Sequence, residues 1–119
     1  MKTIKFVPES LEGTAFKGHV VVENLKSSER MKLMAKCQFQ FDEKGKVVLG
    51  SDAIEKMALM IEIAEPFIKE VDIKSSDAHF KSVDDLQYGS PASLCGKILT
   101  ECASLVMNGS ELSGNSKAL

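Results

Sequence analysis

The chain has 119 residues, of which 44% are hydrophobic and 27% charged, and these values are ordinary for one globular domain. The net charge is −2 and the basic residues are scattered, so the composition shows no footprint for nucleic acid. No apolar run approaches the roughly 20 residues of a membrane-spanning helix, and the N-terminus lacks the apolar region of a signal peptide, so we expect a soluble cytosolic protein without membrane association.

Two short strands are predicted near the N-terminus. Residues 3–7 are compatible with a strand or with a mobile terminus, and Pro8 follows them. Residues 16–23 contain three consecutive valines, whose branching at Cβ favours extended backbone. We therefore predict the second strand over residues 16–23, with Asn24 ending it.

A capped helix and a hairpin are predicted next. The pair Ser27-Ser28 supplies candidate N-caps for a helix over Glu29–Cys37. Residues 37–41 then alternate between apolar and polar side chains, and residues 46–49 predict the returning strand of a hairpin. A helix that continues through Gln40 is the alternative for this region.

The middle of the chain predicts a strongly apolar helix followed by two strands. Ser51 is the candidate N-cap of a helix over Asp52–Glu65, and Pro66 stops it. Its apolar side chains cover most sides, which indicates a helix that is buried or that faces a partner. Strands are predicted over residues 67–74 and 78–80.

A short helix and a long helix are predicted at the C-terminal end. Ser82 begins the short helix. Ser90 is the candidate N-cap of the long helix, Pro91 suits its first position, and Gly109 is placed to end it. The apolar stripe of the long helix consists of Leu94, Cys95, Ile98, Leu99, Cys102, Leu105 and Val106.

The alternation of strand and helix periods predicts an α+β fold. We expect a small mixed domain over residues 1–109, in which a few short strands pack with three to four helices. The polar residues 110–119 have no core-forming pattern and are predicted to form a flexible tail.

Reactive side chains are sparse and occur in no recognisable spacing. The two histidines, His19 and His79, form no metal-ligand motif, and three cysteines are too few and too scattered for a disulfide framework. Cys37, Cys95 and Cys102 are therefore interpreted as small core residues. No catalytic residue, metal site or cofactor is predicted; an enzyme would need a pocket that gathers His19 or His79 with Glu70, Asp72 or Asp77.

The methionines offer a candidate binding surface. Four of them form two pairs at helical spacing on two predicted helices, and methionine suits both uneven cores and adaptable binding surfaces. Together with the stripe of the last helix they form the candidate protein-binding set. Its members are Met31, Met34, Met57, Met60, Leu94, Ile98 and Leu105.

The layout of strands and capped helices carries a resemblance that covers most of the chain. The segments concerned are Gly18–Val22, Leu25–Met31, Ile68–Ile73, Phe80–Tyr88, the final helix and Ser113–Ser116. In these segments the sequence resembles the tail assembly chaperones of long-tailed, siphovirus-type bacteriophages. Each motif is a packing or capping pattern, so the resemblance transfers no catalytic residue.

The resemblance implies a chaperone that binds the long helical tape-measure protein and keeps it soluble while the tail tube forms. It also implies a homo-oligomer, a location in the cytoplasm of the bacterial host, absence from the mature virion, and a longer form made by ribosomal frameshifting. Two alternatives remain open: a structural phage protein, such as a minor tail or head–tail connector protein, and a small nucleic-acid-binding regulator.

Overall fold

The computed structural model describes residues 2–37, 40–41, 43–44, 47–48 and 53–109. Within these ranges the chain forms a four-stranded antiparallel sheet packed with four α-helices, and a separate two-stranded ladder. The predicted α+β fold class is thus confirmed. The predicted tail, residues 110–119, lies outside the described residues, and the domain limit at residue 109 stays a prediction.

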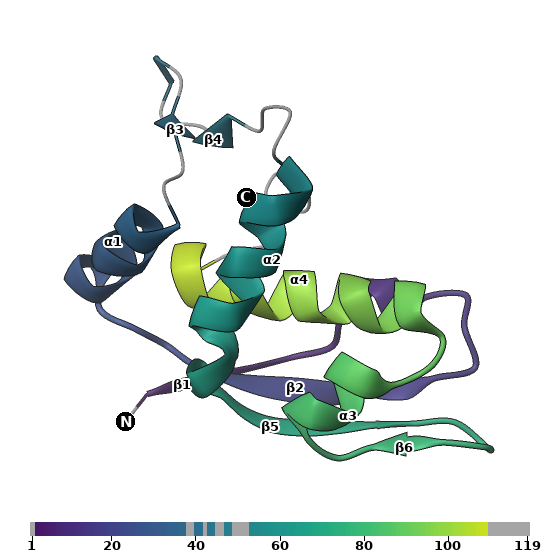
Figure 1. The fold of residues 1–119 in the computed structure, drawn as a ribbon. Helices are drawn as coiled ribbons and strands as arrows, with labels where there is room; N and C mark the ends of the chain where they lie inside the picture. Colours follow the sequence, from purple (N-terminus) through teal and green to yellow (C-terminus); the bar gives the residue numbers. More distant parts are fainter. Residues whose placement is uncertain (1, 38–39, 42, 45–46, 49–52, 110–119) are drawn as a thin grey trace.

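The main sheet consists of β1 (Thr3–Phe6), β2 (Lys17–Glu23), β5 (Ile68–Lys74) and β6 (His79–Phe80), in the spatial order β1-β2-β5-β6 (Figure 1). Every neighbouring pair is antiparallel. Side chains on alternate positions of the two central strands are buried on one face, namely Val20, Val22, Val71 and Ile73. The strand predictions for the N-terminus, for residues 16–23 and for both later strands are confirmed.

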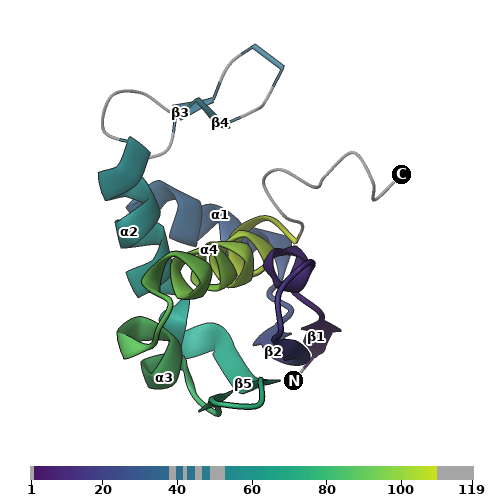
Figure 2. The ribbon, with the colours of Figure 1, turned by 90° about the vertical axis from the view of Figure 1, so that its right-hand side faces the viewer.

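The helices cover this buried face of the sheet (Figures 1 and 2). Helix α4 (Ala92–Asn108) lies across it, and α2 (Ala53–Ala64) crosses over α4. Helices α1 (Ser27–Lys36) and α3 (Val83–Tyr88) flank α4 near its C-terminal and N-terminal ends, respectively. Among the described elements, none covers the opposite face of the sheet.

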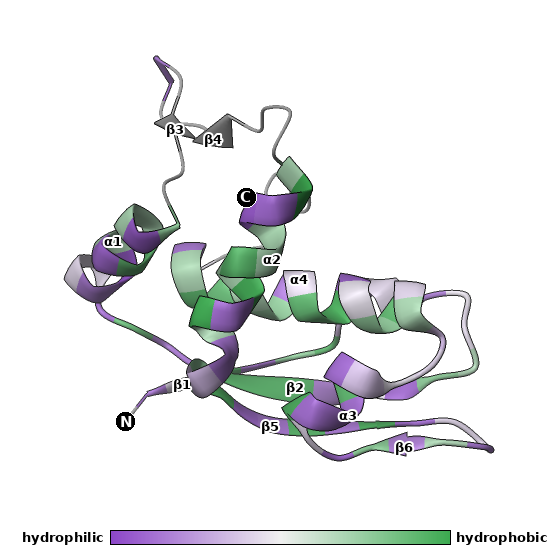
Figure 3. Cartoon of the chain, in the orientation of Figure 1, coloured by the Kyte–Doolittle hydropathy of each residue, from purple (hydrophilic) through white to green (hydrophobic). Residues whose placement is uncertain are grey.

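Helix α4 is the centre of the core. All seven residues of its predicted stripe are buried, and its last turns also bury Ala103, Ser104 and Met107. Figure 3 shows apolar stretches on β2, α2 and α4, whereas α1 is mostly hydrophilic. The predicted apolar stripe of α4 is therefore confirmed, and it packs against this chain's own sheet and helices.

The ends of the helices follow the predicted chemistry only in part. Ser82 caps α3 as predicted, because its Oγ accepts a hydrogen bond from the Asp85 N–H at 3.2 Å. The prediction for the pair Ser27-Ser28 was wrong, since Lys26 occupies the N-cap of α1. There the Glu29 carboxylate accepts from the Lys26 N–H at 3.1 Å, so the helix starts earlier without a serine cap.

The last helix differs from prediction in the same way. Pro91 has extended backbone (ψ 138°) and occupies the N-cap, so the helix begins after it and Ser90 is not the cap. The C-terminus is as predicted: Gly109 adopts the left-handed conformation (φ 75°), and its N–H donates to the Leu105 carbonyl.

The predicted hairpin between the first two helices is confirmed where it is described. Strand β3 (Gln40–Phe41) pairs antiparallel with β4 (Val47–Val48). The alternative, a helix that continues through Gln40, was therefore wrong. Helix α2 ends at Ala64 and a 3-10 turn, η2 (Glu65–Phe67), contains the predicted stop, Pro66. The candidate N-cap of α2, Ser51, lies outside the described residues.

Ser104 is the one polar side chain in the described core whose buried oxygen has no hydrogen-bond partner. A buried hydroxyl without a partner costs about 1–3 kcal/mol, and alanine favours a helix slightly more than serine. We expect Ser104→Ala to raise the free energy of unfolding by about 1 kcal/mol in urea denaturation. Ser93→Ala, at an exposed position of the same helix, should change stability much less; a loss of stability in Ser104→Ala would contradict the expectation.

Candidate functional site

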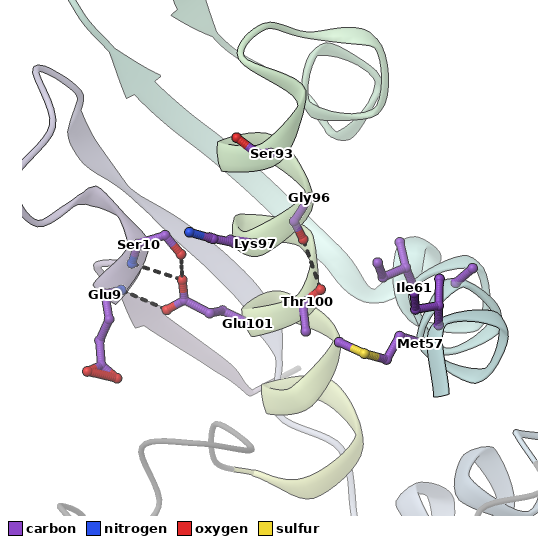
Figure 4. Close-up of a pocket in the computed structure, with 11 residues that line it drawn as sticks. Glu9, Ser10, Met57, Ile61, Ser93, Gly96, Lys97, Thr100 and Glu101 are labelled. Atoms are coloured by element: carbon purple, nitrogen blue, oxygen red, sulfur yellow. Dashed lines mark hydrogen bonds between the residues drawn. The ribbon is translucent and has the colours of Figure 1, made fainter. Parts of the chain in front are cut away.

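A groove of about 960 Å³, open to solvent, lies between α2 and α4 (Figure 4). One wall is a row of apolar side chains on α2: Ile54, Met57, Ala58 and Ile61. Their spacing places them along one side of the helix. Another side of α2 packs into the core, where Met60 and Ala64 are fully buried. The helix is thus apolar toward the core and toward solvent, which explains its apolar composition.

Ile54 is the most prominent side chain of this wall. It is 83% exposed. Single exposed hydrophobic residues are common on protein surfaces. Here, however, Ile54 is continuous with three further apolar side chains in a concave surface, and contiguous apolar patches mark interaction sites.

The floor of the groove is formed by α4. A Cβ added at Gly96 would lie in open space, so no side chain narrows the groove at this position. The neighbouring Thr100 hydroxyl donates to the Gly96 carbonyl at 2.9 Å (Figure 4). Because this hydroxyl is already satisfied, an apolar ligand over Thr100 does not leave it unpaired.

Glu101 holds the other side of the groove in place. Its carboxylate accepts hydrogen bonds from the backbone N–H groups of Glu9 (2.7 Å) and Ser10 (3.0 Å) and from the Ser10 hydroxyl (Figure 4). These donors belong to the 3-10 turn η1 (Glu9–Leu11). Charge-assisted bonds of this kind tie the N-terminal segment to α4 and give the groove a second rim.

Glu101→Gln is expected to lower the free energy of unfolding by about 1.5 kcal/mol, because hydrogen bonds to a charged acceptor contribute about 1.5–3 kcal/mol and this carboxylate is half-buried. The amide oxygen can replace only part of the carboxylate's acceptor capacity. Chemical denaturation monitored by circular dichroism measures the change. Glu12→Gln, at an exposed position, is the control, and equal effects of the two substitutions would argue against the proposed role of Glu101.

The structure separates the seven candidate binding residues. Met57 lines the groove, Met31 is 69% exposed on α1, and Met34 is half-buried against the core. The remaining four are buried in the core: Met60, Leu94, Ile98 and Leu105. The exposed groove residues Ile54 and Ala58 were not in the candidate set, although the apolar composition of their helix was a signal for such a surface.

The two histidines lie on strands of the main sheet. His19 Nε2 is 2.7 Å from Glu70 Oε2, and His79 Nε2 is 2.8 Å from Asp72 Oδ1. The hydrogen bond from His79, aided by the charges of both histidines and Lys74, lowers the pKa of Asp72. These contacts bring together histidine–carboxylate pairs that the sequence alone did not join, and they link neighbouring strands.

Neither pair lines the α2–α4 groove. His79 borders a separate depression of about 360 Å³, whose described lining contains no serine, threonine or cysteine that a histidine could activate. In the described part of the chain no three histidine, cysteine or acidic side chains are arranged to hold a metal ion. The two pairs connect β5 with its neighbours β2 and β6.

The three cysteines are free and buried, as predicted. Burial raises the pKa of the Cys37, Cys95 and Cys102 thiols, which disfavours the reactive thiolate. Cys37 Sγ lies 3.6 Å from Met107 Sδ between α1 and α4. All three side chains therefore behave as packing residues.

Among the described helices, none has the length and apolar character needed to cross a membrane. No protein-family model, curated protein or solved structure matches the chain. We therefore infer the function from the groove between α2 and α4 and from the chemistry of its lining.

Proposed function

We propose that this protein is a non-enzymatic chaperone that binds an apolar face of a helical client in the groove between α2 and α4. The observation that carries the proposal is the apolar α2 wall, in which Ile54 is 83% exposed beside a solvent-open groove of about 960 Å³. A stable monomer gains nothing from such a surface, whereas a protein that holds other proteins needs one.

The geometry of the wall suits a helix. Ile54, Met57 or Ala58, and Ile61 recur at the spacing by which amphipathic helices present their anchors, so a client helix lying along α2 meets an apolar residue on each turn. Met57 adds adaptability, because its unbranched side chain can repack around different contact residues. A groove of this kind binds many apolar helices with modest selectivity.

The resemblance to tail assembly chaperones implies that the client is a tape-measure protein, which is long, helical and apolar. In this proposal the chaperone acts in the cytoplasm of the bacterial host, keeps the tape-measure protein soluble, and is left out of the finished virion. In this proposal a longer form of the chain is also made by ribosomal frameshifting.

Co-expression with the tape-measure protein, followed by affinity capture of the chaperone, tests the proposal. We expect soluble client to be recovered with the wild-type chain, and at least about tenfold less with Ile54→Lys, which places a charge in the apolar wall. Met31→Lys is the matched control, because Met31 is 69% exposed but lies on α1.

Two results would contradict the proposal. The first is a client that stays soluble without the chaperone and is not captured by it. The second is the chaperone as a stoichiometric component of purified virions, which would favour a structural tail protein. If Ile54→Lys and wild type capture equal amounts of client, the client does not bind in the groove.

A further inference from the structure

The face of the main sheet that points away from the helices is polar, and no element in the described part of the chain covers it (Figures 1 and 2). Its side chains alternate along the strands with the buried core residues. The charged residues of this face are four lysines and three acids, namely Lys5, Lys17, Lys69, Lys74, Glu23, Glu70 and Asp72. With its histidines counted as neutral, the face therefore has a charge of +1, whereas the whole chain has −2. Positive charge is thus concentrated on this face.

The unpaired charges of this face are all positive. Two of its three acids pair with the histidines, as described above, and Glu23 Oε1 lies 3.4 Å from Lys69 Nζ. By contrast, the ammonium groups of Lys5, Lys17 and Lys74 form no ion pair or hydrogen bond within the described residues. The face can therefore attract an anion without first breaking an ion pair of its own.

The positive charge is densest at one end of the face. Lys17 and Lys74 lie directly opposite each other in the β2–β5 ladder, and His79 lies opposite Lys74 in the β5–β6 ladder. Like charges at directly opposed positions destabilise a sheet. The neighbouring Asp72 is hydrogen-bonded to His79, so it offsets the repulsion in this row only in part. A negatively charged ligand that lies across the row would offset the rest.

We propose that the row formed by Lys17, Lys74 and His79 binds an acidic segment of a partner protein, whose side-chain carboxylates contact the two lysines. Neighbouring strands lie about 5 Å apart, and side chains on one side of an extended segment recur about every 7 Å. Lysine has a long, flexible stem, so both ammonium groups can reach carboxylates at this spacing. The row lies on the opposite side of the sheet from the α2–α4 groove, so an acidic segment and a client helix can bind at the same time (Figure 1).

An acidic protein segment fits this face better than a nucleic acid does. Proteins hold single-stranded nucleic acid with aromatic side chains on which the bases stack. None of the described strand residues on this face is a phenylalanine, tyrosine or tryptophan. Affinity for a phosphate backbone also grows with the number of cations that contact it, and the whole chain is slightly acidic. We therefore expect a nucleic acid to bind here more weakly than an acidic peptide of equal charge.

Fluorescence anisotropy of a labelled hexaglutamate peptide tests the proposal on the full chain, at low ionic strength where surface charges are weakly screened. We expect saturable binding to wild type, and a dissociation constant raised about fivefold or more by Lys17→Glu or by Lys74→Glu. Lys32→Glu is the matched control, because it changes the net charge equally at an exposed position of α1. It should raise the dissociation constant by less than about twofold, since exposed charges that are far apart are screened.

The same two variants separate binding from folding. Lys17→Glu and Lys74→Glu each place opposite charges at directly opposed positions of the β2–β5 ladder. Each should therefore keep or slightly raise the free energy of unfolding, which urea denaturation measures. Peptide binding that is lost while stability is kept supports a binding role for the row, because a purely structural role would change both together.

Three results would overturn the proposal. The first is a wild-type chain that does not bind hexaglutamate saturably, and the second is a pair of reversals that weaken binding no more than Lys32→Glu does. The third is an oligothymidylate of equal charge that binds more tightly than hexaglutamate, which would assign the face to nucleic acid. Ile54→Ala alters the groove without changing a charge and should bind hexaglutamate as tightly as wild type, so the proposed client site is tested independently by client capture.

Discussion

Gly18→Ala is expected to lower the free energy of unfolding by about 3 kcal/mol or more. Gly18 has φ +149°, a conformation that residues with a side chain rarely adopt. A Cβ at this position would lie 1.9 Å from the Asp72 carbonyl oxygen and 2.7 Å from the Ile73 Cα. These are backbone atoms of β5, so no flexible side chain can move aside, and the central β2–β5 pair would have to separate.

Gly13→Ala is the matched control. Gly13 also has a positive φ (+76°), but an added Cβ there would meet nothing within 4 Å. Gly13→Ala should lower the free energy of unfolding by only about 1–2 kcal/mol, which is the cost of placing a residue with a side chain at positive φ. Urea denaturation monitored by circular dichroism compares the two variants. Equal losses of stability would show that β2 and β5 approach less closely at Gly18 than the structure indicates.

Features that depend on residues close together in the sequence, such as strand propensity and helix caps, could be predicted from the sequence. The valines of β2, the Ser82 cap of α3 and the left-handed Gly109 were all predicted, because the preferences concerned act over a few residues. The failures at Lys26 and Pro91 are of the same local kind. Small differences in backbone geometry decide which of the neighbouring positions at each helix start is the N-cap.

The histidine–carboxylate pairs were beyond sequence reasoning because they depend on strand register. His19 lies opposite Asp72 in the β2–β5 ladder, and its ring nitrogen contacts Glu70 of the same strand. A shift of one residue along the pairing would move these side chains to the other face of the sheet. Composition and spacing contain no information on that register.

The sequence did not predict a groove; it predicted only that one helix is either buried or faces a partner. The apolar sides of the helix over residues 53–64 indicated burial or a partner, and both occur: Met60 faces the core, and Ile54 faces solvent. The groove itself could not be read from the sequence, because it depends on how far α2 lies from α4. An apolar stripe on a helix shows which side chains need an apolar contact, but it does not show which surface makes that contact.

Helix α4 and helix α2 illustrate the two uses of an apolar stripe. The α4 stripe was interpreted as a docking surface, and the structure covers it with the sheet and the other helices. Helix α2 has an apolar face that the described residues cover only in part. The difference between them predicts opposite responses to the same substitution, at Ile98 of α4 and Ile54 of α2.

Ile98→Ala should lower the free energy of unfolding by about 3 kcal/mol, because a fully buried isoleucine leaves a cavity when it is truncated. Ile54→Ala should change it by less than about 0.5 kcal/mol, since that side chain is 83% exposed. Denaturation at a concentration low enough to keep the chain monomeric measures both. Each substitution is the control for the other, because the same atoms are removed from a helix in both cases. A large cost at Ile54, with little at Ile98, would mean that α2 supplies the core and α4 the exposed surface, and the proposed groove would then have no physical basis.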